Sequence, residues 1–264
     1  MDEAKKTKVI RGDAFVKQYL QGKVIDISAG NDLVCEYAER FDLENGDANV
    51  ITRYRQIKSY DCVHSSHCLE HMHDPVAALK EWWALVKPGG YLVIVVPDED
   101  LYEQGIWPSI FNKDHKATFT LKTHQSWSPV SFNIENLVRD LRDAEILSVA
   151  LHDAGYNYAL HHPLKDVADA KNGRTLRRFI VRLLRSIAKR LPFAGNATGR
   201  KVEELGFQVG VPVDQTMRHA VAKIQVVAKN RLASTSGLYT RRSDFFDRKG
   251  RARFVAQNLS TAKF

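Results

Sequence analysis

Cysteine is scarce in this chain, and paired cysteine motifs are absent. The 264 residues contain only Cys35, Cys62 and Cys68, and no Cys-x-x-Cys pair. An odd number of unpaired cysteines argues against both a disulfide framework and a structural zinc site. We therefore expect a protein of a reducing compartment.

Long apolar runs are absent as well. The run at 92–96 is far shorter than the roughly 20 residues that cross a bilayer. The first residues, MDEAKKTKVIRGDAF, lack the apolar stretch of a signal peptide. A hydrophobic content of 44% is that of a globular protein. Together these features predict a cytoplasmic location.

Positive charge is unevenly distributed. The chain has a net charge of +8, yet residues 174–191 alone carry +7 and residues 230–264 carry +6. The remainder therefore carries −5. A nucleic-acid groove needs basic side chains along the binding face, so this distribution argues against a nucleic acid as the substrate.

Residues 174–191 have the pattern of a basic amphipathic helix. Apolar residues recur on one face from Leu176 to Leu191, arginines occupy the other face, and Pro192 ends the pattern. Such a helix can lie in the interface of an anionic membrane, which would place the protein at the inner face of that membrane. It can equally pack its apolar stripe on protein, as a lid or as the contact of a homodimer. The sequence leaves these alternatives open.

The most regular part of the sequence runs from residue 60 to residue 100. Residues 93–96 are continuously apolar, as expected for a strand buried on both faces of a parallel sheet. Five apolar residues before it recur at helical spacing: Val76, Leu79, Trp82, Trp83 and Val86. Lys-Pro-Gly-Gly at 87–90 predicts the end of that helix. The pattern predicts a β-α-β unit, whose ligands would bind beyond the carboxyl ends of the strands.

The same stretch carries Ser-Ser-x-x-Leu-Glu-His at 65–71, Asp-Pro at 74–75 and Leu-Val-Lys-Pro-Gly-Gly at 85–90. In this order the motifs resemble those of class I S-adenosylmethionine-dependent methyltransferases, and the resemblance covers roughly residues 20–160. It implies S-adenosylmethionine as cofactor and methyl transfer to a small-molecule acceptor. It also implies an α/β fold: a Rossmann-like three-layer sandwich with a mostly parallel, seven-stranded sheet and an antiparallel last strand.

The implied fold is shortened at one place and extended at another. Only 35 positions separate Asp26 from Asp61, the expected ends of the first and fourth strands, so at least one helix is shortened or lost there. Residues 144–152 and 220–228 are expected to form the hairpin that closes the sheet, with a helical insertion at about 160–215 before the last strand. The domain would span residues 1–229, followed by a basic, flexible tail at 230–264.

The sequence Asp-Ile-Ser-Ala-Gly-Asn-Asp at 26–32 stands where the family has the loop Asp-x-Gly-x-Gly-x-Gly. Gly30 keeps the second glycine, whereas Ser28 and Asp32 replace the first and third. The resemblance implies a set of cofactor-binding residues: Asp26, Ser28, Gly30, Asp42, Asp47, Ala48, Ser65 and His67. Within it, a carboxylate at a strand end would accept from the ribose diol. The two replaced glycines also suggest an alternative, a non-catalytic binding or regulatory module with the same fold.

The acceptor would bind near residues 97–127, which are rich in aromatic and polar side chains but lack periodicity. We interpret this loop as suited to a sugar or a cell-envelope precursor. A hydroxyl acceptor needs a general base, and the candidate catalytic residues are His115 and His124. His67 and His71 have the i, i+4 spacing of zinc-binding histidines, but the acid of His-Glu-x-x-His is missing. The sequence therefore predicts no metal site.

Overall fold

The computed structural model describes residues 3–123, 125–161, 183, 212–217 and 220–231. The predicted basic helix, the core of the insertion and the tail after residue 231 lie outside the described residues. In chain order the elements are α1 (Glu3–Tyr19), β1 (Val24–Ile27), β2 (Glu39–Phe41), η1 (Leu43–Asn45), η2 (Ala48–Arg53), β3 (Tyr60–Ser66), η3 (Leu69–His71), α2 (Pro75–Ala84), β4 (Val86–Pro97), η4 (Glu99–Glu103), β5 (Thr118–Thr120), β6 (Ser131–Asn133), α3 (Ile134–Arg139), β7 (Ala144–His152), η5 (Tyr158–Leu160), η6 (Gln215–Met217) and β8 (Lys223–Asn230).

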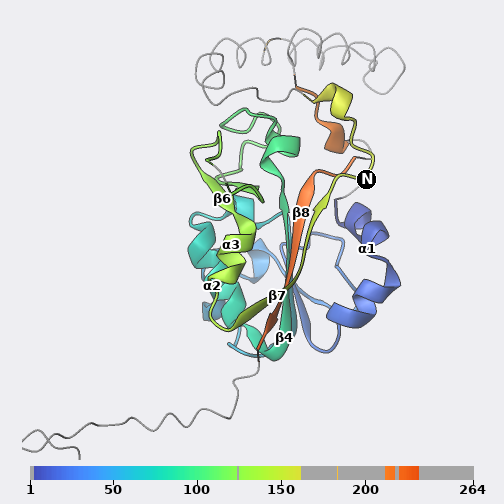
Figure 1. Cartoon of the computed structure of the whole chain (residues 1–264). Helices are drawn as coiled ribbons and strands as arrows, with labels where there is room; N and C mark the ends of the chain where they lie inside the picture. The colour runs from blue at the N-terminus through green and yellow to red at the C-terminus, as the bar shows by residue number, and fades with distance from the viewer. Residues whose placement is uncertain (1–2, 124, 162–182, 184–211, 218–219, 232–264) are drawn as a thin grey trace, which may run out of the picture. The chain divides into compact units, whose positions relative to one another are not determined.

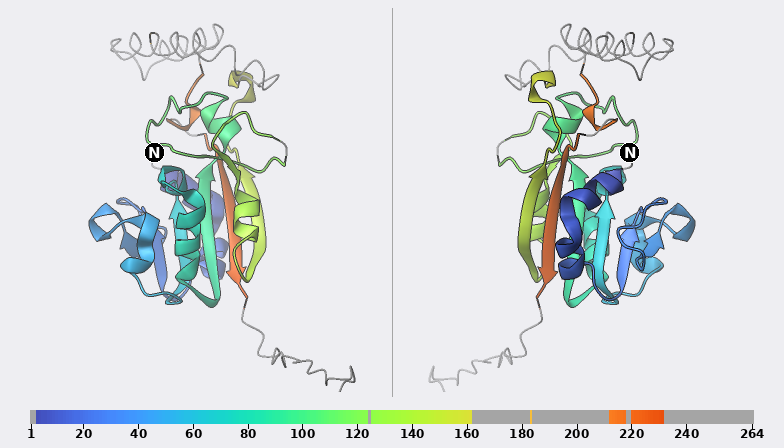
Figure 2. Two further views of the ribbon diagram at one scale, coloured as in Figure 1. Left: turned by 90° about the vertical axis from the view of Figure 1, so that its left-hand side faces the viewer. Right: turned by 90° about the vertical axis from the view of Figure 1, so that its right-hand side faces the viewer.

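A six-stranded sheet with the order β2-β1-β3-β4-β8-β7 forms the centre of the fold. The first four strands of this order run parallel, whereas β8 is antiparallel to both β4 and β7. α1 covers one face of the sheet, and α2 and α3 cover the other (Figure 1, Figure 2). These features confirm the predicted Rossmann-like sandwich and its closing antiparallel hairpin.

The described part of the chain contains one strand fewer in this sheet than the seven expected. Between β2 and β3 it forms the short 3-10 helices η1 and η2, and no helix separates β1 from β2. The indole of Trp82 donates a hydrogen bond to the carbonyl oxygen of Ala48 at 2.8 Å, so η2 packs directly on α2. The predicted shortening between the first and fourth strands therefore removes the third strand and the helix before the second.

The sequence pattern of α2 and β4 explains their packing. Asp74 caps α2 by accepting hydrogen bonds from the backbone N–H groups of Val76 and Ala77, and Pro75 occupies the first turn. The apolar face of α2 packs into the core with Trp82 fully buried. β4 is covered on both faces, as its continuous apolar run predicts.

Lys-Pro-Gly-Gly at 87–90 forms an irregularity within β4 rather than a turn before it. The pairing of β4 with β3 passes from Val86 directly to Tyr91. A Cβ atom on Gly90 would lie 2.8 Å from the backbone oxygen of Asp61, so only glycine fits this close approach. α2 already ends at Ala84 and Val86 is the first residue of β4, so the helix is shorter and the strand begins earlier than the sequence predicts.

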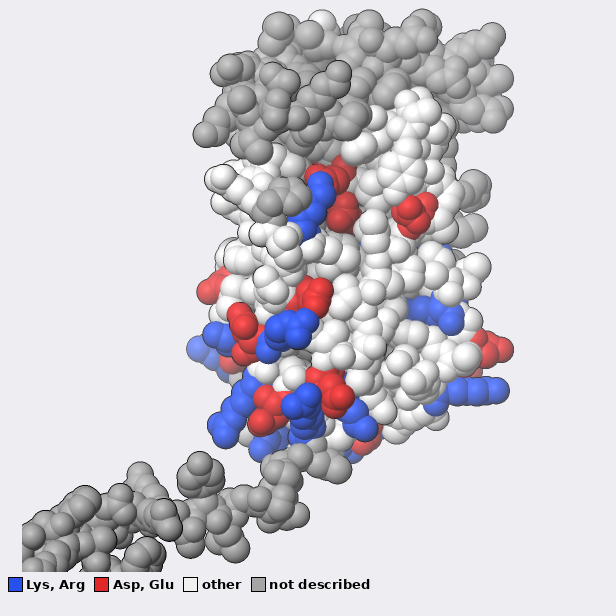
Figure 3. Space-filling view, in the orientation of Figure 1, with Lys and Arg blue, Asp and Glu red and all other residues white. Residues whose placement is uncertain are grey.

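The described surface shows no gathering of charge that would indicate a nucleic-acid groove on the face drawn in Figure 3. Lysine and arginine side chains alternate there with aspartate and glutamate. Among the described residues, no helix combines the length and the apolar character that crossing a membrane requires.

Candidate functional site

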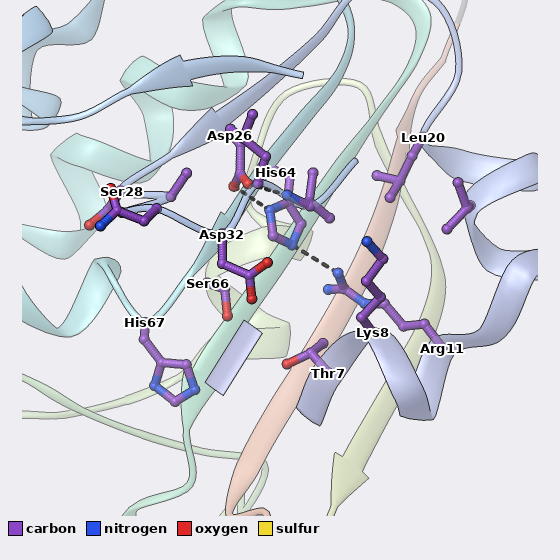
Figure 4. Close-up of a pocket in the computed structure, with 16 residues that line it drawn as sticks. Thr7, Lys8, Arg11, Leu20, Asp26, Ser28, Asp32, His64, Ser66 and His67 are labelled. Atoms are coloured by element: carbon purple, nitrogen blue, oxygen red, sulfur yellow. Dashed lines mark hydrogen bonds and ion pairs between the residues drawn. The ribbon is translucent and has the colours of Figure 1, made fainter. Parts of the chain in front are cut away.

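A cavity of about 460 Å³ lies at the carboxyl ends of β1 and β3. Its walls are α1, the loop 28–34 after β1, and residues at the end of β3 (Figure 4). The volume is that of a small-molecule site, and open α/β sheets bind their ligands at this edge. The cavity is therefore the candidate functional site.

The loop after β1 has the tight backbone that its small residues permit. Ser28 and Gly30 both have positive φ, of 63° and 57°. The N–H of Ser28 donates to the carbonyl oxygen of Phe41 at 2.7 Å, and the N–H of Gly30 donates to Oδ2 of Asp42 at 2.9 Å. The end of β2 thus holds the loop in place, although serine occupies a conformation that favours glycine.

A chain of buried hydrogen bonds runs from the loop across the cavity wall. Asp26 accepts from the N–H of Val34 at 2.7 Å, and its other oxygen lies 2.6 Å from Nδ1 of His64. Nε2 of His64 lies 2.9 Å from Nη1 of Arg11, and Nε of Arg11 donates to Gln225 at 2.6 Å. β1, the loop after it, β3, α1 and β8 are therefore linked behind the cavity, and Figure 4 shows the two contacts of His64.

The neighbours of His64 determine its tautomer. A guanidinium only donates, so Nε2 must accept from Arg11, and Nδ1 must carry the hydrogen that is donated to Asp26. Burial lowers the pKa of His64; Asp26 opposes this shift and Arg11 adds to it. Burial also lowers the pKa of Arg11 to about 10, which leaves the guanidinium charged at neutral pH. The hydrogen-bonded series thus consists of a carboxylate, a neutral imidazole and a charged guanidinium.

Three buried polar atoms of the cavity lining have no hydrogen-bond partner among the described residues. They are Nη2 of Arg11, Oδ2 of Asp32 and Oγ of Ser66. Buried polar groups are normally paired, so these atoms indicate a polar ligand. A guanidinium and a carboxylate facing one cavity match the carboxylate and the ammonium of an amino acid.

The structure places the predicted cofactor-binding residues in three groups. Those that line the cavity are Asp26, Ser28, Gly30 and His67. Asp42 adjoins the cavity through its bond to Gly30. Those outside the lining are Asp47, Ala48 and Ser65. Their binding roles stay predictions.

The reasons for these positions are local. Asp47 caps η2 by accepting from the N–H of Asn49 at 2.8 Å, and Ala48 lies on the side of η2 that packs on α2. Ser65 alternates along β3 with His64 and Ser66, which do line the cavity, so its side chain belongs to the other face of the sheet. Arg11 and Ser66 were not among the site residues predicted from the sequence. Asp32 was predicted only as the replacement of a glycine, although a carboxylate at such a position is itself a signal.

His115, the preferred catalytic candidate, is buried in the loop before β5. Its Nδ1 lies 2.6 Å from Oε1 of Glu103, and its ring lies 5.0 Å from the ring of His71 and 5.3 Å from that of Tyr102. Glu103 thus fixes the ring with Nδ1 protonated, which leaves the lone pair on Nε2. The second candidate, His124, lies outside the described residues.

Backbone contacts hold this loop against η3. The carbonyl oxygen of Glu70 accepts from the N–H groups of Lys116 at 2.7 Å and Ala117 at 3.2 Å. Nδ1 of His71 lies 3.3 Å from the carbonyl oxygen of Asp114. Through these contacts the Leu-Glu-His step and His115 form one cluster next to the cavity, because Glu70 also lies 3.3 Å from the cavity residue His67.

Comparisons with known proteins give a family match. A family model described as a methyltransferase domain matches residues 9–161, more than half of the chain. A search of curated protein sequences found no match. Among solved structures, a SAM-dependent methyltransferase from Archaeoglobus fulgidus is 15% identical, with 86% of this chain and 93% of that chain covered and a TM-score of 0.44. Haemonchus contortus phospholethanolamine N-methyltransferase 2 is 11% identical, with 87% and 53% covered and a TM-score of 0.41.

Proposed function

The chain belongs to the family of methyltransferase domains, and from this premise we propose that it transfers a methyl group from S-adenosylmethionine to a small-molecule acceptor. The cofactor is the one that the sequence predicts and the family uses. The observation that carries the proposal is the cavity at the ends of β1 and β3, with the unpartnered Nη2 of Arg11 and Oδ2 of Asp32 in its lining.

The residues of the cavity fit this cofactor at both ends. Arg11 would bind the carboxylate of the methionine moiety and Asp32 its ammonium, since both atoms lack a partner among the described residues. Gly30 presents no side chain, and a Cβ atom built there would meet open space. Asp42, held beside Gly30, would accept a hydrogen bond from the ribose diol.

The cofactor, when bound, supplies an electrophilic methyl group on a sulfonium. The protein then has to hold the acceptor atom in line with that methyl group and to exclude water, which accounts for most of the catalysis in such a displacement. α1 lines the cavity on one side, and the segment at Lys116 and Ala117 is hydrogen-bonded to η3. The acceptor would therefore enter near His67 and His71.

His115 is the residue we propose as general base for a hydroxyl acceptor. Glu103 holds its Nδ1 hydrogen, so the Nε2 lone pair is available to take a proton, and the carboxylate stabilises the imidazolium that forms. This is the carboxylate–imidazole arrangement of many general bases. A sugar or a cell-envelope precursor stays our prediction for the acceptor.

The first test is binding of S-adenosylhomocysteine to the full chain by isothermal titration calorimetry. We expect saturable binding, and an absence of heat at millimolar ligand would contradict the proposal. The second test supplies S-adenosylmethionine with a tritiated methyl group and a cell extract, separated by size into small molecules and macromolecules. Label in the small-molecule fraction is expected. Binding without any transfer would favour the alternative, a non-catalytic module.

A further inference from the structure

The cluster at the acceptor side contains a set of ligand atoms that methyl transfer by itself does not require. Glu70, His71 and His115 each offer one such atom, and these atoms lie within 4.8 Å of one another. Glu70 and His71 come from η3, whereas His115 comes from the loop before β5. Two segments that are distant in the sequence therefore contribute to one group.

The hydrogen bonds of the two imidazoles fix which nitrogen of each ring has a lone pair. Nδ1 of His115 faces the Glu103 carboxylate, and Nδ1 of His71 faces the carbonyl oxygen of Asp114. Both oxygens accept, so both Nδ1 atoms carry hydrogen and both neutral rings have their lone pair on Nε2. Metal-binding histidines are typically held in this way by a carboxylate or a carbonyl oxygen.

The carboxylate of Glu70 is the third ligand group, and its surroundings are unusual. The residue is 1% exposed, and neither carboxylate oxygen has a hydrogen-bond partner among the described residues. Its Oε1 lies 3.3 Å from Nδ1 of His67. A buried anion without hydrogen bonds is costly, and a cation would compensate it.

We propose that Glu70, His71 and His115 form a binding site for a divalent transition-metal ion, with zinc as the metal of choice. Two imidazoles and one carboxylate form a common zinc ligand set with an open position, whereas magnesium and calcium prefer oxygen ligands alone. In a tetrahedral zinc site the ligand atoms lie roughly 3.3 Å apart. The half-buried ring of His71 can move inward to reach this spacing, because Glu70 and His115 are held in the interior.

The metal site can exist whether or not the protein is a methyltransferase. A catalytic role of the metal, however, rests on the proposed function. An acceptor hydroxyl bound at the open position would release its proton to solvent at lower pH than an unbound hydroxyl does, because the metal stabilises the alkoxide. The Nε2 lone pair of His115 would then bind the metal and could not take a proton. The free imidazole and the bound metal are therefore alternative means of activating the acceptor.

Cobalt(II) serves as the probe, because its visible d–d absorption reports imidazole and carboxylate coordination. We expect the full-length, metal-stripped protein to bind one Co²⁺ per chain, with an absorption band that Zn²⁺ abolishes. Glu70→Gln and His71→Gln should each lose the band. The control is His73→Gln, which changes an exposed histidine close to the cluster and should retain it.

The outcomes separate clearly. An absence of the band in the wild-type protein at millimolar Co²⁺, or an undiminished band in both variants, overturns the proposal. If circular dichroism shows that Glu70→Gln does not fold, His71→Gln decides, since its ring is only half-buried. S-adenosylhomocysteine binding, measured on the same samples, shows whether the cofactor site is intact. The failure of one proposal is thereby distinguishable from the failure of the other.

Discussion

Asp26 and His64 are direct partners on neighbouring parallel strands, and their side chains form a buried pair with Nδ1 and Oδ1 2.6 Å apart. The pair joins the loop after β1 to Arg11 on α1, on the opposite wall of the cavity. Asp26 uses both carboxylate oxygens for protein contacts, so its contribution to binding is to position the loop and, through His64, the guanidinium.

Arg11→Ala is expected to weaken binding of S-adenosylhomocysteine roughly 10- to 100-fold, because a hydrogen bond to a charged group contributes about 1.5–3 kcal/mol. The measurement is the dissociation constant by calorimetry at constant pH and salt. Lys17→Ala, an exposed change on the same helix and outside the cavity lining, is the control and should bind as the wild type does. Equal affinities of the two variants would show that Arg11 does not bind the cofactor.

His64 is expected to be the Nδ1-protonated tautomer at neutral pH, which is the less common form of a free histidine. The physical reason is the contact of Nε2 with a guanidinium that has no acceptor. Long-range nitrogen–proton NMR correlations distinguish the two tautomers, and loss of the signals in His64→Asn assigns them. A protonated Nε2 with a bare Nδ1 would exclude the hydrogen-bond chain as described.

Stability is expected to fall as the pH falls below about 6.5, the ordinary value for histidine. The pKa of His64 is lowered in the folded protein, chiefly by burial, so the unfolded chain binds a proton that the folded chain does not. The free energy of unfolding then decreases by up to about 1.4 kcal/mol per pH unit for this group. Urea titrations between roughly pH 8 and pH 5 measure the slope.

His64→Asn tests the assignment of this slope. The variant should show a weaker dependence on pH than the wild type, since the unfolded chain then takes up one proton fewer. His73→Asn, at an exposed position, should keep the wild-type slope. His71 and His152 also have lowered pKa values, again chiefly through burial, so part of the slope should persist in His64→Asn.

The predictability of the fold differs from that of the site for a physical reason. The apolar run of β4 and the helical spacing of α2 are local patterns, and the structure confirms them, as it does the closing hairpin that the family resemblance implied. The irregularity at 87–90 escaped prediction because it depends on the close approach of Gly90 to Asp61, a contact between strands. A local sequence pattern carries no information about the distance between two strands.

Only those parts of the site that are formed by consecutive residues could be predicted from the sequence. The loop 26–32 and the Leu-Glu-His step could be recognised because their residues are consecutive. Arg11 could not, since its place at the cavity depends on how α1 packs against β3 and β8. For the same reason the spacing of His67 and His71 in the sequence does not reveal that His71 lies beside His115, which comes from another segment.

Asp98 is expected to be a destabilising carboxylate at neutral pH. Burial is the main reason that the pKa of Asp98 is raised to about 6. The neighbouring acids Asp100 and Glu99 add to the shift, and the backbone N–H groups that donate to Asp98 oppose it. Because the folded pKa lies above the unfolded one, ionisation costs free energy that grows as the pH rises and becomes constant above about 6. Asp98→Asn removes this cost and keeps the oxygen that accepts from the N–H of Leu101.

We therefore expect Asp98→Asn to increase the free energy of unfolding at pH 7.5, a value above that folded pKa, by on the order of 1–2 kcal/mol. The gain should disappear below about pH 3.8, where the wild-type carboxyl is protonated in the unfolded chain as well as in the folded protein. Asp74→Asn is the matched control: Asp74 caps α2 in the same way but is exposed, so its change should stay within about 0.5 kcal/mol. A gain at Asp98 that does not vary with pH would arise from packing rather than from the charge, and would contradict the raised pKa.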